Sequence, residues 1–168
     1  MLNKKAFRVS ETIAIAKKEK DQNEALFDQF QTMSNTQVDH LMEDSHDEVF
    51  AEHDCLTCAN CCKTTSPIIE PIDIDRIALA LNMKPVEFKI EYLIIDEDGD
   101  YVFYQSPCPF LEEDNRCRVY EHRPRACREY PHTNRKKDVQ IRDLTIKNSS
   151  ICPAVSMILS KIRKGLHA

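Results

Sequence analysis

The stretch Cys55-Leu56-Thr57-Cys58-Ala59-Asn60-Cys61-Cys62 holds four cysteines within eight residues, and the rest of the chain is best interpreted outward from it. A Cys-x-x-Cys step brings two sulfur atoms around a tight turn onto one ion, which is the local half of most structural zinc and iron–sulfur sites. Cys61 lies one further three-residue step along and extends the same backbone into a chelating loop. An ordinary apolar core has no need of four thiols so close in sequence. The stretch therefore predicts a metal site.

Length and charge narrow the class of protein. The 168 residues suffice for one domain with a buried core, or for one domain and a helical extension. A net charge of −5 argues against a general nucleic-acid binder, which is usually basic. No window approaches 18 apolar residues, and the first residues lack the apolar core of a signal peptide. We therefore expect a cytoplasmic protein that binds neither nucleic acid nor a membrane.

The cytoplasm keeps thiols reduced, so all eight cysteines are candidate metal ligands. A disulfide scaffold is the alternative if the protein is exported. Eight thiols could fill two four-coordinate sites, or one site with cysteines to spare. The candidate ligands are Cys55, Cys58, Cys61, Cys62, Cys108, Cys117, Cys127 and Cys152.

Two of these positions carry a specific expectation. Adjacent residues of an extended chain point to opposite sides, so Cys61 and Cys62 need not share one ion. Either one of them is a ligand beside a small buried thiol, or both serve a multinuclear site. Cys152 stands at the N-cap of a helix that Pro153 would start, where the helix terminus should lower the pKa of its thiol.

The first 54 residues are rich in good helix formers, and Ser34 to Gln37 form a capping box that opens a second helix. Between residues 43 and 54 the sequence has six acids and neither lysine nor arginine. This segment is either the solvated face of a helix or an acidic docking surface for a protein partner.

The middle of the chain predicts two short helices and a hairpin. Asp73 is a candidate N-cap for the first helix. Pro85 suits the first position of the second helix, whose buried face should carry Val86 and Ile90. The acidic run at residues 96–100 lacks the glycine and the glutamate that a calcium loop needs at fixed positions. Its Asp-Gly pair instead favours a β-hairpin that joins residues 93–95 to 101–104.

The last helix should bury the stripe at residues 155, 158, 159 and 162 and stop at Gly165.

The arrangement of the cysteines resembles a known family. The motifs are Cys55-x-x-Cys58-x-x-Cys61-Cys62, then Cys108-Pro109-Phe110-Leu111, then Cys117-x-x-Tyr120-x-x-Arg123-Pro124-x-x-Cys127-Arg128-x-Tyr130-Pro131. Together they resemble the CxxCxxCC, or YkgJ-type, cysteine-cluster proteins over roughly residues 52 to 155. The resemblance implies a zinc- or iron-chelating domain. The family often has glycine after the second cysteine, where this chain has Ala59.

A flagellin lysine methylase is related to the family through the same cysteine motif. That relation implies an alternative function, an iron–sulfur protein with a 4Fe-4S cluster and redox or protein methyl-transfer activity. The chain has no glycine-rich nucleotide loop, so the enzymatic role is not carried over.

The sequence as a whole predicts a small, mainly helical α+β domain with a short antiparallel β-hairpin or meander and a loop-built cysteine cluster. Residues 1–50 are expected to form a helical N-terminal extension, and residues 51–168 the cysteine-cluster metal-binding domain. The expected function is binding of zinc or iron rather than catalysis.

Overall fold

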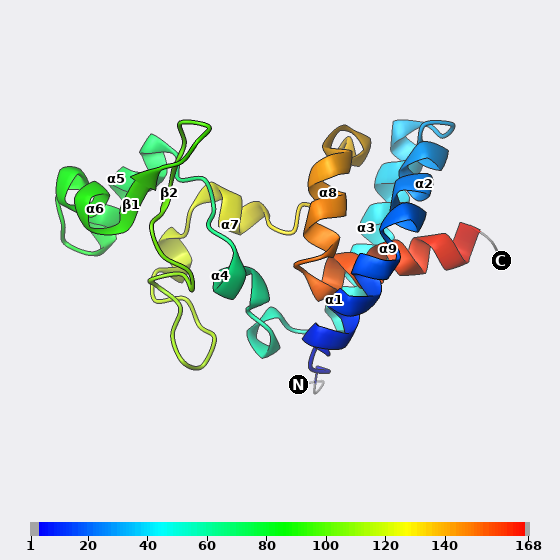
Figure 1. The fold of residues 1–168 in the computed structure, drawn as a ribbon, viewed down its shortest axis with the longest axis horizontal. Coiled ribbons are helices and arrows are strands. Elements are labelled where there is room, and N and C mark those ends of the chain that lie inside the picture. Colours follow the sequence, from blue (N-terminus) through cyan, green and yellow to red (C-terminus); the bar gives the residue numbers. More distant parts are fainter. Residues whose placement is uncertain (1–3, 167–168) are drawn as a thin grey trace. The chain divides into compact units, whose positions relative to one another are not determined.

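The computed structural model describes residues 4–166. Within them the chain forms nine α-helices, three short 3-10 helices and one two-stranded antiparallel sheet (Figure 1). The predicted mainly helical α+β fold with a short hairpin is confirmed. No helix in this described range is long and apolar enough to cross a membrane.

The chain divides into two compact units. The first, called here the helical unit, is discontinuous in sequence and consists of the chain up to Cys58 and again from Pro131 onward. The second, called here the inserted unit, spans residues 59–130 between those two parts. The predicted division into residues 1–50 and 51–168 concerns the extent of the cysteine domain and stays a prediction.

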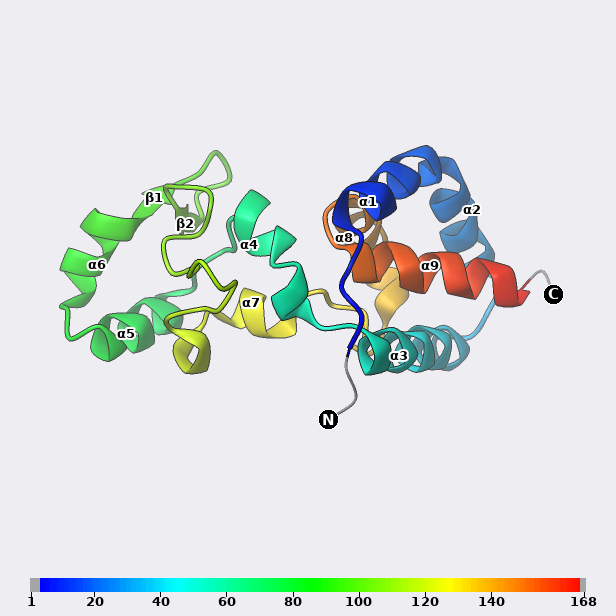
Figure 2. The same cartoon turned by 90° about the horizontal axis from the view of Figure 1, so that it is seen from below.

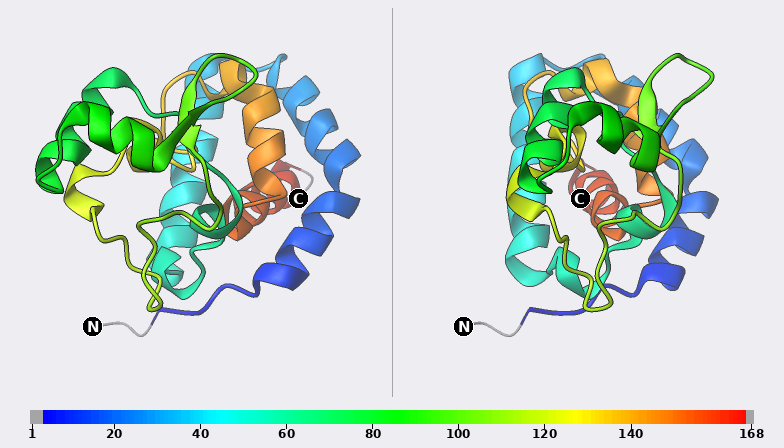
Figure 3. Two further views of the ribbon diagram at one scale, coloured as in Figure 1. Left: turned by 60° about the vertical axis from the view of Figure 1, so that its left-hand side comes forward. Right: turned by 90° about the vertical axis from the view of Figure 1, so that its left-hand side faces the viewer.

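Five α-helices and two 3-10 turns make up the helical unit. They are α1 (Val9–Lys18), α2 (Lys20–Phe30), α3 (Asn35–Glu52), η1 (Cys55–Thr57), η3 (Asp138–Ile141), α8 (Arg142–Ser149) and α9 (Pro153–Leu166). Helix α9 packs against α1, α3 and α8, and so lies at the centre of this unit (Figures 2 and 3).

Helix α9 begins at Pro153, as predicted, because proline suits a first helical position whose N–H has no helical acceptor. The predicted stripe is buried in the core of the unit, since residues at these spacings share one helix face. The predicted stop at Gly165 is wrong, because α9 runs through Gly165 to Leu166. A glycine near a helix end costs only about 1 kcal/mol relative to alanine and does not compel a break.

Helix α3 begins with the predicted capping box. The Ser34 hydroxyl accepts a hydrogen bond from the Gln37 backbone N–H at 3.3 Å, and the Gln37 side chain accepts one from the Ser34 backbone N–H at 3.0 Å. Two N–H groups that would lack helical partners are thereby satisfied. The acids farther along α3 are partly neutralised, because Glu48 pairs with Lys161 and Glu52 pairs with Lys5.

Asp138, in η3, should make the stability of the helical unit depend on pH. Its side chain is fully buried, and neither of its carboxylate oxygens has a hydrogen-bond partner within residues 4–166. Burial, together with the nearby Asp39 carboxylate, raises the pKa of Asp138 to about 7. Because this value exceeds the pKa of about 4 expected in the unfolded chain, the stabilising contribution of the protonated group is complete below about pH 4. It should be lost as the pH rises through about 7.

We expect the Asp138→Asn variant to lack this loss of stability between pH 4 and pH 7. Urea unfolding followed by circular dichroism at several pH values, with the metal content held equal, measures the effect. Parallel pH profiles for the wild type and the variant would contradict the assignment.

The inserted unit contains the hairpin, four α-helices and one 3-10 helix. Its elements are α4 (Asn60–Thr64), α5 (Pro71–Ala80), α6 (Pro85–Tyr92), β1 (Leu93–Ile95), β2 (Tyr101–Phe103), η2 (Tyr120–His122) and α7 (Arg125–Glu129). The predicted hairpin is confirmed, with Leu93 opposite Phe103 and Ile95 opposite Tyr101. Gly99 has a φ of +88°, which is the backbone conformation that favours glycine in such a turn.

Two details of α5 and α6 differ from the prediction. Helix α5 begins at Pro71 with Glu70 as its N-cap, so Asp73 lies in the first turn and is fully buried rather than capping the helix. Helix α6 begins at Pro85 as predicted, but it buries Phe88 and leaves Val86 and Ile90 exposed. The large ring of Phe88 buries more apolar area than Val86 or Ile90 would, which decides the face on which this short helix packs.

The core of the inserted unit is centred on Phe110. Its ring packs edge-on against Phe103, with centroids 5.5 Å apart, and lies 5.0 Å from the ring of Tyr92. The Arg118 guanidinium lies over the same ring at 5.3 Å. Since Phe110 follows Cys108 by two residues, the aromatic core also fixes the loop that carries this cysteine.

Candidate metal centre

All eight cysteines lie among the described residues, and each is a thiol rather than half of a disulfide. They fall into two groups according to the compact unit that contains them. The helical unit holds Cys55, Cys58 and Cys152, and the inserted unit holds Cys61, Cys62, Cys108, Cys117 and Cys127.

Backbone hydrogen bonds hold three cysteine-bearing segments of the inserted unit side by side. The Cys108 N–H donates to the Cys62 carbonyl at 2.8 Å, which ties the end of α4 to the loop after β2. The Leu111 N–H donates to the Cys108 carbonyl at 3.0 Å, and Leu111 pairs with Cys117 in an antiparallel bridge. The three cysteines are thus brought together by main-chain contacts rather than by their position in sequence.

The fourth cysteine of this group, Cys127, is positioned through Asp73. Cys127 lies in α7, and the backbone N–H of Arg125 in the same helix donates to both carboxylate oxygens of Asp73 at 3.2 Å. Asp73 also pairs with Arg76, whose guanidinium donates to the Arg123 carbonyl at 3.0 Å. A buried carboxylate of α5 therefore anchors the start of the helix that carries Cys127.

The thiols of the inserted unit act on one another electrostatically. Burial, together with negative charge on Cys62, Cys108 and Cys117, raises the pKa of Cys127 to about 12. Burial likewise raises the pKa of Cys108 to about 11 and that of Cys117 above its usual range. Thiolates at these half-buried positions would repel one another, so Cys108, Cys117 and Cys127 stay protonated at neutral pH until a positive charge compensates them.

The vicinal pair lies in a helix rather than in extended chain, which corrects the premise of the sequence interpretation. Cys61 and Cys62 belong to α4, where successive side chains are about 100° apart, and their sulfur atoms are 4.0 Å from each other. The hydrogen bond with Cys61 lowers the pKa of Cys62 to about 7, and Lys63 contributes in the same direction. Cys62 is therefore the most readily ionised thiol for which a shift is resolved.

Ala59, which precedes α4, has a φ of +48° and a ψ of 24°. This left-handed conformation costs a residue with a Cβ atom about 1–2 kcal/mol, whereas glycine adopts it readily. The loop geometry is thus one for which glycine, rather than alanine, is the favoured residue.

The three thiols of the helical unit come from both ends of its sequence. The Cys58 N–H donates to the Cys55 carbonyl at 2.9 Å, which closes the turn of η1. The Asp54 side chain supports that turn by accepting from the Leu56 N–H at 2.9 Å. Cys58 is buried in the apolar core of this unit, and Cys152 packs against the same core.

The predicted low pKa of Cys152 is wrong. Burial, with a smaller contribution from negative charge on Cys55 and Cys58, raises the pKa of this thiol to about 11. The backbone N–H groups of Ala154 and Val155 at the start of α9 act in the opposite direction, as predicted, but burial outweighs them. The three thiols lie close enough for their charges to interact.

The donor set fits zinc or iron by type and number, since thiolates bind both metals and four of them complete a tetrahedral site. The side chains are not in a metal-binding arrangement, because within residues 4–166 no three histidine, cysteine, aspartate or glutamate side chains are placed to hold one ion. Binding would therefore require rotation of the cysteine side chains around the ion.

A comparison of the sequence with models of protein families found one family model that matches the region containing the cysteines. The model of the CxxCxxCC family, described as a "Putative zinc- or iron-chelating domain", matches residues 54–153. The chain belongs to this family. The matched region contains all eight cysteines, and the resemblance predicted from the motifs is confirmed. A search of curated proteins and a search of solved structures found no match.

Membership of the CxxCxxCC family supports chelation of zinc or iron as the general function of residues 54–153. The sequence interpretation missed the positioning role of Asp73 and Arg76 within that region. The signal available was an aspartate in the first turn of an apolar helix, which was interpreted as a cap. Its partners lie about 50 residues away in sequence, so local patterns could not reveal them.

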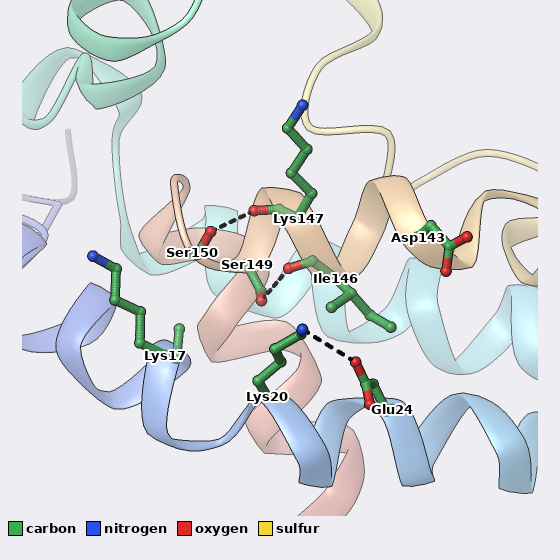
Figure 4. A pocket seen from close by; sticks show the side chains of 9 residues that line it. Lys17, Lys20, Glu24, Asp143, Ile146, Lys147, Ser149 and Ser150 are labelled. Carbon is green, nitrogen blue, oxygen red and sulfur yellow. Dashed lines mark hydrogen bonds and ion pairs between the residues drawn. The ribbon is translucent and has the colours of Figure 1, made fainter.

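A surface pocket of the helical unit lies apart from this chemistry. It is lined by Lys17, Lys20, Lys147 and Ser149, among others, and by no cysteine (Figure 4). The lysine side chains point in different directions, and Lys20 pairs with Glu24 at 3.6 Å. The pocket therefore offers no convergent set of charges.

Proposed function

We propose that the protein binds zinc or iron at two thiolate centres, one within each compact unit. The centre of the inserted unit would use Cys62, Cys108, Cys117 and Cys127. The centre of the helical unit would use Cys55, Cys58 and Cys152. The observation that carries the proposal is that backbone hydrogen bonds bring the cysteine-bearing segments of the inserted unit side by side. The mutual effect of the thiols on one another's pKa within each unit supports it.

The four thiolates of the inserted unit would complete a closed tetrahedral site. One divalent ion with four thiolates has a formal charge of −2, which nearby cations must offset. Arg123 and Arg118 act in this sense, because both lower the pKa of Cys117. The iron form of this centre would be a 4Fe-4S cluster, for which four cysteines are also the common ligand set.

The remaining predicted ligand, Cys61, would support this centre from beside it. Its hydrogen bond favours the thiolate of Cys62 at neutral pH. The centre of the helical unit has three cysteines, so a tetrahedral ion there would take its fourth ligand from outside the set. Thiolates persist in reducing compartments, which supports the proposal of a cytoplasmic location.

Metal and acid-labile sulfide analysis of protein purified without oxygen tests the proposal. For zinc we expect about two ions per chain, since each centre holds one. Cys127→Ser and Cys152→Ser should each remove about one ion, and the double variant about two. For iron, sulfide in near-equal amount would identify a cluster.

Each variant is the control for the other. If either substitution alone removes all the metal, the eight cysteines form a single centre and the proposal of two is wrong. Wild-type protein without zinc or iron after purification in their presence would overturn metal binding itself.

A further inference from the structure

Helices α5 and α6 expose large apolar side chains away from their core. On α5, Ile72 is 66% exposed and Leu79 is 79% exposed. On α6, Val86 is 65% exposed and Ile90 is 81% exposed. The two residues of α5 are seven positions apart and the two of α6 are four positions apart, so the residues of each pair lie on one face of their helix.

These faces point outward from a shared core. Ile74 and Ile77 of α5 and Phe88 of α6 belong to the same buried cluster, and helical periodicity places the exposed residues on the opposite sides. The two helices are consecutive, pack against each other and are joined by a short turn (Figure 2). We call the set Ile72, Leu79, Val86 and Ile90 the α5–α6 outer face.

Negative charges accompany this apolar face. Asp75 lies between Ile72 and Leu79 on the same side of α5, three residues after the first and four before the second. Glu87 and Glu91 run along α6 next to its exposed apolar pair, and both are exposed. Lys89, the lysine of α6, lies over the ring of Tyr101 at 5.0 Å from the ring centroid. Residues 70–100 together contain nine acids and three bases.

We propose that the α5–α6 outer face docks a basic amphipathic helix of a partner protein. Covering an exposed apolar surface lowers the free energy of the system. A partner helix with apolar residues three and four positions apart can pack its apolar side against the exposed side chains of α5 and α6, which have helical spacing as well. Lysine or arginine beside the apolar stripe of the partner would meet Asp75, Glu87 and Glu91.

The same charges disfavour other occupants. A second copy of this chain would bring its own acids to the contact, and an anionic bilayer would likewise repel them. The proposal uses residues distinct from the cysteines and is independent of metal binding.

Fluorescence anisotropy with full-length, metal-loaded protein provides the test. The probe is a labelled amphipathic helix of leucine and lysine, about 18 residues long so that it forms a stable helix, and the control probe replaces lysine with glutamate. We expect the lysine peptide to bind and the glutamate peptide not to bind. Ile90→Ser and Leu79→Ser should each weaken binding at least about fivefold, because each removes a buried apolar contact.

Charge and position are tested by two further variants. Glu87→Gln combined with Glu91→Gln should weaken binding and reduce its dependence on salt. Leu144→Ser removes an apolar side chain that is 40% exposed in the helical unit, and it should leave binding unchanged. Circular dichroism and metal content equal to those of the wild type show that each variant is folded.

Several outcomes would overturn the proposal. They are equal binding by the wild type and Ile90→Ser, equal binding of the two peptides, self-association that Ile90→Ser abolishes, and binding to anionic vesicles without binding to the lysine peptide. The third would assign the face to a second copy of the chain, and the fourth to a membrane.

Discussion

Removal of metal should unfold the inserted unit while the helical unit keeps most of its structure. The inserted unit has roughly 70 residues, a size at which an apolar core alone supplies little stability and a bound metal commonly adds to it. Its only sheet within the described chain has two strands, and residues 104–119 contain neither helix nor strand. We therefore expect a metal bound by Cys108 and Cys117 to add substantially to the stability that the packing of Phe110 gives this loop.

The expected effect is large. The apparent free energy of zinc binding in zinc-finger peptides near neutral pH is about 10–16 kcal/mol. This is comparable with the whole free energy of unfolding of a typical domain, which is about 5–15 kcal/mol. Hydrogen exchange followed by mass spectrometry should show protection in β1, β2 and α7 falling by more than about 100-fold after chelation or in Cys127→Ser.

Amides of α3 in the helical unit are the internal reference, and the Cys152→Ser variant is the matched substitution. In that variant the loss of protection should be confined to the helical unit. Persistent protection of residues 59–130 in metal-free Cys127→Ser protein would show that the aromatic core around Phe110 suffices, and would contradict a structural role for the metal.

The Asp73→Ala substitution should destabilise the inserted unit by about 3–5 kcal/mol. Asp73 is fully buried, pairs with Arg76, and accepts hydrogen bonds from the backbone N–H groups of Glu70 and Arg125. Its loss would leave a half-buried guanidinium and N–H groups without partners. Because Arg125 begins the helix that carries Cys127, affinity for the metal should fall as well. Guanidinium unfolding and a competitive chelator titration measure the two effects.

Asp75→Ala is the control, because Asp75 is exposed on the same helix and its substitution should change stability by less than about 0.5 kcal/mol. Equal unfolding midpoints for Asp73→Ala and Asp75→Ala would show that α7 is held by other contacts.

Local features of the fold could be predicted from the sequence because their causes are local. The capping box at Ser34 and the Asp-Gly turn of the hairpin depend on residues within a few positions of each other. The stripe of α9 is long and regular enough to identify its buried face.

Features that depend on distant contacts could not be predicted in the same way. In α6 the spacing of Val86 and Ile90 looks like a buried stripe, but Phe88 is buried because Phe110 and Tyr92 lie beside it. The pKa of Cys152 depends on burial against residues at the other end of the chain. The division of the thiols between two units follows from the packing of α9 against α1 and α3, which no local pattern encodes.

The discontinuity of the helical unit has a consequence for the order in which the protein is made. Helix α3 ends at Glu52, but its partner α9 begins only at Pro153. During synthesis on the ribosome, about 100 residues must therefore be added after α3 before the segment that completes the core of the helical unit has been made. Residues 59–130 emerge in full during that interval, and they form a compact unit of their own. If the inserted unit holds the metal centre proposed above, the nascent chain would acquire that metal before the helical unit closes. Loss of α9 by a premature stop would abolish the helical unit yet spare the inserted one.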